Sequence, residues 1–366
     1  MLSESERLAW LRLARTEHVG PVTFAGLIAR FGSAKAALAE LPRMAARGGA
    51  RKFVAAPDDE AAREIAELSR IGGRLIASCE SEFPQGLAAL DPPPPVISVV
   101  GQIPLLKREM VAIVGARNAS ALARKFAFML AEELGGAGLA VASGLARGID
   151  TAAHEGALKT GTVAVLAGGV DIIYPPENEK LYAAIRDQGA IISEMRLSEA
   201  PQARHFPRRN RLISGLARGL VVVEAAERSG SLITANYALE QGREVFAVPG
   251  SPLDPRAKGT NRLIREGAAL TESAEDVLSV LRPIIGNDFR EPDLFAPGPP
   301  PDTKDLEQEA DQVRTRIEEA LGPAPVGVDE LIRMTGAPAA AVQTVLLELE
   351  LAGRCRRHPG NFVSWC

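Results

Sequence analysis

The chain has 366 residues, of which 46% are hydrophobic and 24% charged, and this composition is typical of a globular protein with two or three domains. The formal net charge of −4 excludes a uniformly basic protein that coats nucleic acid, so any nucleic-acid site must be local. The three cysteines (Cys79, Cys355 and Cys366) lack metal-ligand spacing and indicate free thiols in a reducing compartment. Residues 1–14 lack the order of a signal peptide and no apolar run reaches 18 residues, so we expect a cytoplasmic protein without a membrane segment.

Two proline-rich segments predict the domain boundaries. Residues 91–95 are DPPPP, and residues 286–309 carry five prolines among acidic residues, a composition typical of a linker. We therefore expect an N-terminal domain at residues 1–90, a central domain at 96–285, a linker at 286–309 and a C-terminal domain at 310–366. The linker predicts that the C-terminal domain is separable from the rest.

The N-terminal domain shows two apolar runs at helical spacing around a Gly-Pro break. The first run covers residues 8–13, the break is HVGP at residues 18–21, and the second run covers residues 24–31 and ends at Gly32, a favourable helix terminator. This order predicts a helix-hairpin-helix or SAM-like element, whose backbone amides can face a phosphate. A hairpin that only packs against a neighbour fits the pattern equally well.

The central domain alternates short apolar runs with helical patterns. We expect strands at residues 110–114, 139–142, 162–166, 190–193, 219–223 and 244–248, and helices notably at residues 121–134, 179–187 and 232–241. Continuous apolar strands separated by helices predict a parallel sheet covered on both faces. The fold class is therefore α/β, with a doubly wound parallel sheet whose ligands bind beyond the carboxyl ends of the strands.

The C-terminal domain has the pattern of a winged helix. Helices are expected at residues 313–321, 328–334 and 339–351, followed by a strand pair at 354–357 and 362–365. The second and third helices carry few basic residues, and Arg333 is the obvious one. We therefore favour a protein-contact or auxiliary role for this domain over the reading of bases.

The loop after the first central strand is GARNAS, residues 115–120. A dinucleotide-binding fingerprint would place glycine where Arg117 stands and again three residues later, so the usual binding of NAD or FAD is not expected, and no cofactor is predicted. Arg117 follows Gly115 at the end of a strand and precedes a helix N-terminus, a position that suits a phosphate oxygen. A structural ion pair is the alternative.

The loop after the second strand is SGLARGID, residues 143–150. Gly144 and Gly148 can adopt positive φ and leave the loop uncovered, so several backbone N–H groups can converge on one anion. Ser143 adds a hydroxyl and Arg147 a positive charge. Asp150 is placed to cap the helix that follows. Together with the first loop, this glycine-rich turn predicts an anion site.

Residues 201–218 form a third candidate, because they contain five arginines and no Asp or Glu. The arginines are Arg204, Arg208, Arg209, Arg211 and Arg218. Guanidinium groups match phosphate geometry, and Phe206 and Asn210 are placed to stack on a base or to hydrogen-bond with it. An ordinary solvated surface would mix charge signs. Two later loops, at residues 229–235 and 249–261, complete the rim of the expected site.

These blocks resemble the DNA-processing protein A family, also called Smf. The matching stretches, in order across residues 110–265, are VAIVGARNAS, SGLARGIDTAAH, AVLAGGVDIIYPPEN, FPRRNRLISGL, VVVEAAERSGSLITANYALEQGREVFAVPG and KGTNRLI. The resemblance implies an extended Rossmann-like domain and a homodimer that binds single-stranded DNA and loads the RecA recombinase during recombination and natural transformation (competence). By residue, it points to Arg117, Ser143, Gly144, Gly148, Arg208, Arg209 and Arg211. No local motif identifies residues that contact RecA.

The main alternative is a nucleotide-hydrolysing enzyme of the lysine-decarboxylase-like Rossmann group. Those enzymes carry P-G-G-x-G-T-x-x-E, but after Gly259-Thr260 this chain has Leu263 at the position of the catalytic glutamate. The chain has no Gly-Lys dipeptide and hence no P-loop, and its four histidines lack the spacing of metal ligands. Glu224 could act as an acid, although we expect it to pair with an arginine or to cap a backbone turn. We therefore predict no catalytic residue and no enzymatic activity.

Overall fold

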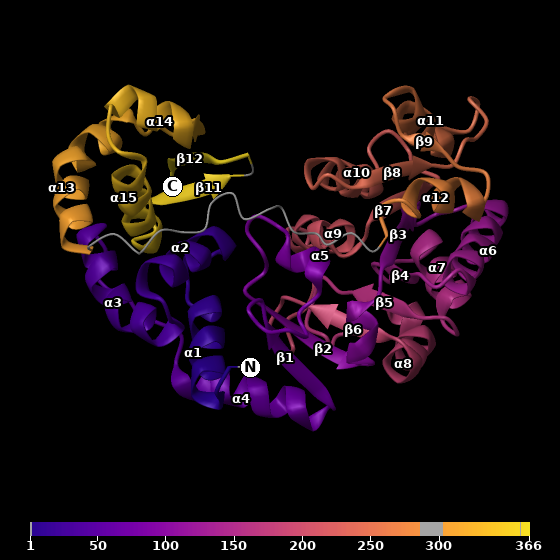
Figure 1. The fold of residues 1–366 in the computed structure, drawn as a ribbon, viewed down its shortest axis with the longest axis horizontal. Coiled ribbons are helices and arrows are strands. Elements are labelled where there is room, and N and C mark those ends of the chain that lie inside the picture. The colour runs from indigo at the N-terminus through magenta and orange to yellow at the C-terminus, as the bar shows by residue number, and fades with distance from the viewer. Residues whose placement is uncertain (1, 286–302, 359) are drawn as a thin grey trace. The chain divides into compact units, whose positions relative to one another are not determined.

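The structure, a computed structural model, describes residues 2–285, 303–358 and 360–366 and divides into two compact units (Figure 1). The terminal unit joins Met1–Arg63 to Glu291–Cys366, and the central unit is Glu64–Arg290. Helix α4 (Asp58–Arg70) runs across the division between them.

The central unit is built on one nine-stranded sheet with the order β1-β2-β6-β5-β4-β3-β7-β8-β9. The strands are β1 (Gly73–Ala77), β2 (Val96–Gly101), β3 (Met110–Gly115), β4 (Ala140–Ser143), β5 (Thr162–Val165), β6 (Ala190–Ser193), β7 (Gly219–Val223), β8 (Glu244–Ala247) and β9 (Ala269–Leu270). From β6 to β9 every neighbouring pair is parallel. The six expected strands all lie within one residue of their observed bounds, so the predicted doubly wound α/β fold is confirmed.

Helices cover both faces of this sheet because its strands are apolar on both sides. The helices are α5 (Gln85–Ala88), α6 (Ala121–Gly136), α7 (Ile149–Ala157), α8 (Glu179–Gln188), α9 (His205–Leu216), α10 (Gly230–Glu240), α11 (Lys258–Arg265) and α12 (Ala274–Leu281), with short 3₁₀ turns η1 (Ile103–Lys107), η2 (Pro176–Asn178) and η3 (Pro255–Ala257). On β3, Ala112 belongs to the core formed with α9 and α10, whereas Val111 and Ile113 belong to the core formed with α6, α7 and α12. Alternate side chains of one strand thus anchor helices on opposite faces.

The proline-rich segment at residues 91–95 is not the domain boundary that its composition predicts. Strand β1 pairs antiparallel with β2, with Gly73 opposite Val100 and Ala77 opposite Val96, and β2 pairs antiparallel with β6. The prolines therefore lie in a connection within one sheet. Proline lacks a backbone N–H and cannot join a central ladder, so the loops of a sheet and the linkers between domains share this composition.

The terminal unit combines N-terminal helices with a C-terminal winged helix. It contains α1 (Glu4–Arg15), α2 (Pro21–Phe31), α3 (Ala34–Arg47), α13 (Thr303–Ala320), α14 (Val328–Thr335) and α15 (Ala339–Leu351), with a small antiparallel sheet of β10 (Val326–Gly327), β12 (Phe362–Trp365) and β11 (Cys355–His358). Helix α2 ends as expected at Gly32, whose φ is 74°. The expected three helices and strand pair of the winged helix are present.

The winged helix is not the separate unit that the proline-rich segment predicts, because α15 packs against α3 and α2 as well as against α13. A Cβ atom on Gly48 would lie 1.9 Å from the carbonyl oxygen of Glu348, so the end of α3 approaches the backbone of α15 closely. Helix α13 begins at Thr303, inside the segment expected as linker. The rest of that segment, residues 286–302, lies outside the described residues.

No single helix of the described residues is long and apolar enough to cross a membrane. Helices α2 and α3 meet the length and composition only when taken together, and the pair is bent by 106°. Leu27 of α2 and Leu41 of α3 are fully buried in the terminal unit.

Candidate nucleic-acid interface

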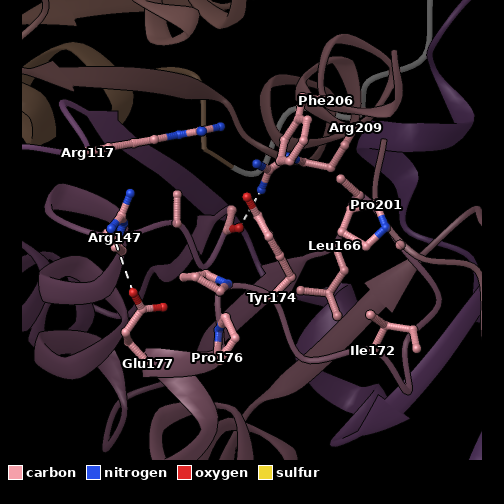
Figure 2. A pocket seen from close by; sticks show the side chains of 15 residues that line it. Arg117, Arg147, Leu166, Ile172, Tyr174, Pro176, Glu177, Pro201, Phe206 and Arg209 are labelled. Atoms are coloured by element: carbon pink, nitrogen blue, oxygen red, sulfur yellow. Dashed lines mark hydrogen bonds and ion pairs between the residues drawn. The ribbon is translucent and has the colours of Figure 1, made fainter. Parts of the chain in front are cut away.

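Three loops meet beyond the carboxyl ends of β4, β3 and β7, which are neighbours in the sheet. Two cavities lie there, one of about 190 Å³ (Figure 2) and one of about 600 Å³, and both are lined by Arg117, Phe206 and Arg209. A third, of about 510 Å³, is also lined by Arg117, together with Arg147 and Gly148. These cavities lie at the edge of the sheet where the doubly wound fold predicts a ligand site.

Arg117 occupies the centre of this region. Its side chain is exposed, and its guanidinium carbon lies 5.1 Å from the centroid of the Phe206 ring. Figure 2 shows the side chain extending toward Phe206 and Arg209. No ion pair joins Arg117 to a carboxylate in the described part of the chain. The structural ion pair that was the alternative interpretation of Arg117 is therefore not observed. Its charge is available to a ligand.

The glycine-rich loop binds an anion of its own. One carboxylate oxygen of Asp150 accepts hydrogen bonds from the backbone N–H groups of Gly144 at 3.1 Å and Ala146 at 3.3 Å. An internal carboxylate therefore occupies these two amides, and the contact of the rest of the loop with an external anion stays a prediction. Asp150 also does not cap the following helix, since α7 begins at Ile149 and the carboxylate turns back to the loop.

Gly148 keeps its predicted conformational role, with φ of 82°. A Cβ atom there would lie 2.3 Å from the carbonyl oxygen of Ala116, so only glycine allows the second loop to approach the first. Gly115 is equally constrained, because its Cβ would lie 1.9 Å from the carbonyl oxygen of Val223. These glycines bring the loops together, and a direct contact of either with DNA stays a prediction.

Arg209 is buried beneath the glycine-rich loop and is 6% exposed. Its Nη1 donates hydrogen bonds to the carbonyl oxygens of Gly144 at 2.5 Å and Val165 at 2.9 Å. Burial lowers the pKa of Arg209 to about 10, although the Asp150 carboxylate opposes the shift. Arg209 therefore supports the loop, and its side chain also lines two of the cavities. Its contact with a phosphate stays a prediction.

The other predicted arginines on α9 face a carboxylate. Arg211 donates to Glu194 at 2.5 Å, and Nε of Arg208 lies 3.6 Å from the same carboxylate. Neither arginine lines the three cavities described above. Ser143 is buried, and its hydroxyl donates to the carbonyl oxygen of Ile113 at 2.6 Å, so it is occupied within the protein.

Asn210 and Arg147 lie where a ligand can reach them. Asn210 lines the 600 Å³ cavity, and its side-chain amide donates to the carbonyl oxygen of Gly230 at 3.3 Å. Arg147 is 62% exposed and lies 3.6 Å from the carboxylate of Glu177, an ion pair drawn in Figure 2. An exposed pair of this length contributes little to stability, so Arg147 can exchange Glu177 for a phosphate at small cost.

His154 is a buried supporting residue that the sequence reasoning missed. The Thr162 hydroxyl donates to Val141, so it accepts from Nδ1 of His154 at 2.7 Å, and Nε2 accepts from the backbone N–H of Leu145 at 3.3 Å. Burial, together with the positive charge of Arg209, lowers the pKa of His154 to about 3. The signal in the sequence was its position four residues after Asp150, on the same face of α7.

Glu224 holds the first loop. Its carboxylate accepts from the backbone N–H of Ser120 at 2.9 Å and from the Ser120 hydroxyl at 2.7 Å, at the start of α6. Of the two expectations for this residue, the cap of a backbone turn is the one observed. Its φ of 52° is unusual outside glycine, and strain of this kind concentrates at functional sites.

Tyr174 is a second residue that the sequence reasoning missed. Its ring lies 5.9 Å from the Phe206 ring, and the side chain is 46% exposed at the smaller cavity (Figure 2). The only signal was an aromatic residue before two prolines in a loop. Paired aromatic faces beside guanidinium groups are a surface on which nucleobases stack.

Comparisons with known proteins identify the family. The family model for DNA recombination-mediator protein A matches residues 74–282. The models for the DprA-like N-terminal HHH domain and the DprA winged helix domain match residues 4–66 and 297–361.

Individual relatives agree with these matches. Protein Smf of Escherichia coli (strain K12) is 37% identical over 319 residues, which cover 86% of this chain and 83% of that protein. The X-ray structure of DNA processing protein A from Streptococcus pneumoniae has a TM-score of 0.64 and 35% identity, and the match covers 76% of this chain and 98% of that one. A structure that describes the single-stranded DNA binding mode of DNA processing protein A from Helicobacter pylori has a TM-score of 0.54 and 29% identity, over 59% of this chain and 98% of that one. The chain therefore belongs to the DNA recombination-mediator protein A (DprA/Smf) family.

Proposed function

We infer that this protein binds single-stranded DNA at the interface around Arg117 and acts as a recombination mediator without catalysing a reaction. The observation that carries the proposal is the position of Arg117, an exposed cation without an ion-pair partner in the described residues, at the junction of three cavities. A phosphate placed there would meet a free guanidinium, and the neighbouring base would meet the faces of Phe206 and Tyr174.

The shape of the interface favours a single strand over a duplex. The smaller cavity, of about 190 Å³, is lined by both charged and apolar side chains, among them Arg117, Leu166 and Phe206. A flexible single strand can turn an unpaired base toward such a cavity, whereas the bases of a duplex are stacked and paired. The Helicobacter pylori relative, whose single-stranded DNA binding mode has been described, supports this choice.

Further parts of the proposal rest on membership of the family. We propose that the protein acts in the cytoplasm as a homodimer, delivers the bound strand to RecA and serves natural transformation in a competent host. The family model, which describes a DNA recombination mediator, supports the association with recombination.

One position supports the proposal that the protein has no enzymatic activity. It is the position at which nucleotide-hydrolysing enzymes of the lysine-decarboxylase-like group carry their catalytic glutamate. Leu263 stands there, on α11, and its side chain is 4% exposed and packed into the hydrophobic core. A carboxylate is needed at that position for the general acid–base step, and leucine offers none. Glu224, the alternative acid, is engaged with Ser120.

The experiment that tests the proposal is a binding titration with a labelled oligonucleotide as a single strand, as a duplex of equal length and as RNA, at two salt concentrations. We expect the DNA single strand to bind more tightly than the duplex, with little dependence on base sequence. Equal or tighter binding of the duplex would contradict the pocket as the site. A parallel assay for release of phosphate or base from ATP and nucleoside monophosphates should show no turnover.

A further inference from the structure

The terminal unit brings together two segments of opposite charge. Residues 1–57 carry nine Lys and Arg against four Asp and Glu, a formal net charge of +5, in a protein whose total is −4. Residues 303–366 carry seven Lys and Arg against ten Asp and Glu, a net charge of −3. A basic segment within an acidic protein is a common electrostatic sign of a nucleic-acid partner.

Three arginines of α2 and α3 converge on one carboxylate of the winged helix, Glu307. Nη1 and Nη2 of Arg43 lie 3.1 and 2.6 Å from its two oxygens, Nη1 of Arg47 lies at 3.1 Å and Nη2 of Arg30 at 3.3 Å. The Glu307 side chain is 14% exposed, so this contact is largely shielded from water. One carboxylate cannot neutralise three guanidinium groups, and the remaining charge has to be balanced elsewhere.

A second layer of carboxylates supplies that balance. Arg47 also pairs with Asp311 at 2.8 Å and, through Nε, with Glu348 at 2.9 Å. The Glu348 side chain is 1% exposed and pairs in addition with Arg314 of α13. Both carboxylates belong to the winged helix, so nearly all of the counter-charge of this N-terminal surface comes from a distant part of the sequence.

The hairpin before α2 is covered by the same domain. The hydroxyl of Thr23, in the first turn of α2, donates to the carboxylate of Glu350 at 2.6 Å. On the other side of the hairpin, a Cβ atom on Gly353 would lie 3.0 Å from Nε2 of His18. In this structure the hairpin therefore packs against the winged helix, and a carboxylate lies where the first turn of a helix favours an anion.

We propose that Arg30, Arg43 and Arg47, the arginine face of α2 and α3, form a second binding site for nucleic-acid phosphates, and that the winged helix occupies this site as an internal competitor. Carboxylate and phosphate accept the same paired N–H donors of arginine, so Glu307 takes the position that a phosphate oxygen pair would take. Once the winged helix leaves, Glu40, 2.8 Å from Arg43, is the acidic partner that α3 itself retains.

The arrangement also defines what the winged helix does. Helix α15, the third helix, by which such domains usually read the major groove, is buried along most of its length, including Val345, Glu348 and Leu349. In the docked state it is committed to contacts within the terminal unit. The domain therefore blocks a phosphate site, and α15 is not presented to a duplex.

The test uses the full-length protein with Glu307→Gln, which removes the shared carboxylate but keeps its size. Asp59→Asn is the matched control, because Asp59 belongs to the terminal unit, pairs with Arg63 and is 74% exposed. Binding of a labelled 30-nucleotide single strand is measured against salt concentration for each variant. Glu307→Gln and Asp59→Asn are also made in an Arg117→Ala background, so that binding at the arginine face is measured independently of the central-unit site.

We expect Glu307→Gln to raise the affinity at least threefold and to steepen the slope of log K against log salt by about 0.7 for each additional phosphate bound. Asp59→Asn should leave the slope unchanged, and adding Arg43→Ala to Glu307→Gln should reverse the gain. The gain should also appear in the Arg117→Ala background, whether or not that change itself weakens binding.

Two results would overturn the proposal. An unchanged affinity and slope in both Glu307→Gln and the double variant Glu307→Gln/Asp311→Asn would show that the arginine face does not take phosphates. A gain that survives Arg43→Ala, or that Asp59→Asn reproduces, would show a general effect of removing negative charge. If thermal melting shows that Glu307→Gln is unstable, Asp311→Asn replaces it in the same binding titrations, because the Asp311 side chain is 60% exposed. The expected changes in affinity and salt slope have the same sign.

Discussion

Nη1 of Arg209 lies 2.5 Å from the carbonyl oxygen of Gly144, so an arginine of α9 supports the glycine-rich loop after β4 directly. A Cβ atom on Gly144 would lie 1.7 Å from that same nitrogen. The glycine is therefore needed to admit the guanidinium, and the guanidinium is needed to support the loop. This relationship assigns Arg209 to the framework of the interface.

Replacing Arg209 with Gln should lower the melting temperature more than it changes the salt dependence of DNA binding. The change leaves two buried carbonyl groups without their donor, at a cost of about 1–3 kcal/mol each, and removes a positive charge that favours the buried Asp150 carboxylate. Thermal unfolding and salt titrations of binding measure the two effects. Arg282→Gln is the control, since Arg282 is 59% exposed and pairs with Glu275. A stable Arg209→Gln with a flatter salt slope would instead make Arg209 a phosphate ligand.

Gly144→Ala should destabilise the protein and weaken binding of single-stranded DNA. The added methyl group would overlap the buried Arg209 guanidinium, which has little room to move because it also bonds to Val165. Gly136→Ala is the matched control, because nothing lies within 4 Å of the added atom at the end of α6. Gly136→Ala should be neutral or slightly stabilising, by up to about 1 kcal/mol. Circular dichroism melts and anisotropy titrations of both variants decide the comparison.

Arg117→Ala should weaken single-strand binding about tenfold, or about 1.4 kcal/mol, without changing the melting temperature. Arg117 is exposed and lies over Phe206, so its removal deletes a ligand contact and leaves the core intact. The slope of log K against log salt should flatten by about 0.7, the value for one phosphate contact on a single strand. Arg282→Ala should alter neither quantity. Lower affinity with an unchanged slope would mean that Arg117 acts on the fold of the loop.

Acid should destabilise the protein through His154. Because its folded pKa is about 3 and its unfolded pKa about 6.5, the unfolded state binds more protons between these values, so stability falls as the pH is lowered through that range. The His154 contribution is at most about 1.4 kcal/mol for each pH unit below 6.5. Burial raises the pKa of Asp150, which titrates in the opposite sense, so the readout is the difference between variants.

The measurement for His154 is the melting temperature from pH 7 to pH 4. His154→Gln should be less stable at neutral pH and should lose part of the decline on acidification. His18→Gln, at a histidine whose side chain is 44% exposed, should keep the decline of the unmodified protein. Equal pH profiles for the protein and His154→Gln would show that this histidine is not the titrating group.

Much of the central fold follows from local patterns in the sequence. The strands from β3 to β8 are continuous apolar runs, and their bounds agree with the predicted ones to within one residue, because burial on both faces demands apolar side chains at every position. Arg117 was likewise predictable, since a strand end followed by a helix start specifies the edge of the sheet on which it lies. Strand β1 and the role of residues 91–95 were not, because antiparallel pairing at an edge depends on contacts across the sheet.

Which charges remain available to a ligand was decided by the tertiary structure alone. Arg211 is two residues from Arg209 in the sequence, yet it pairs with Glu194 after β6, whereas Arg209 turns beneath Gly144. Arg208 remains 55% exposed at 3.6 Å from the Glu194 carboxylate. The amides of Gly144 and Ala146 in the glycine-rich loop are likewise taken by Asp150. A residue type and its spacing state what a group can bind, but the partner that binds it is the one that folding brings within about 3 Å. For this chain, the sequence alone placed three loops at one edge of the sheet, and tertiary contacts determined which protein groups each of their side chains meets.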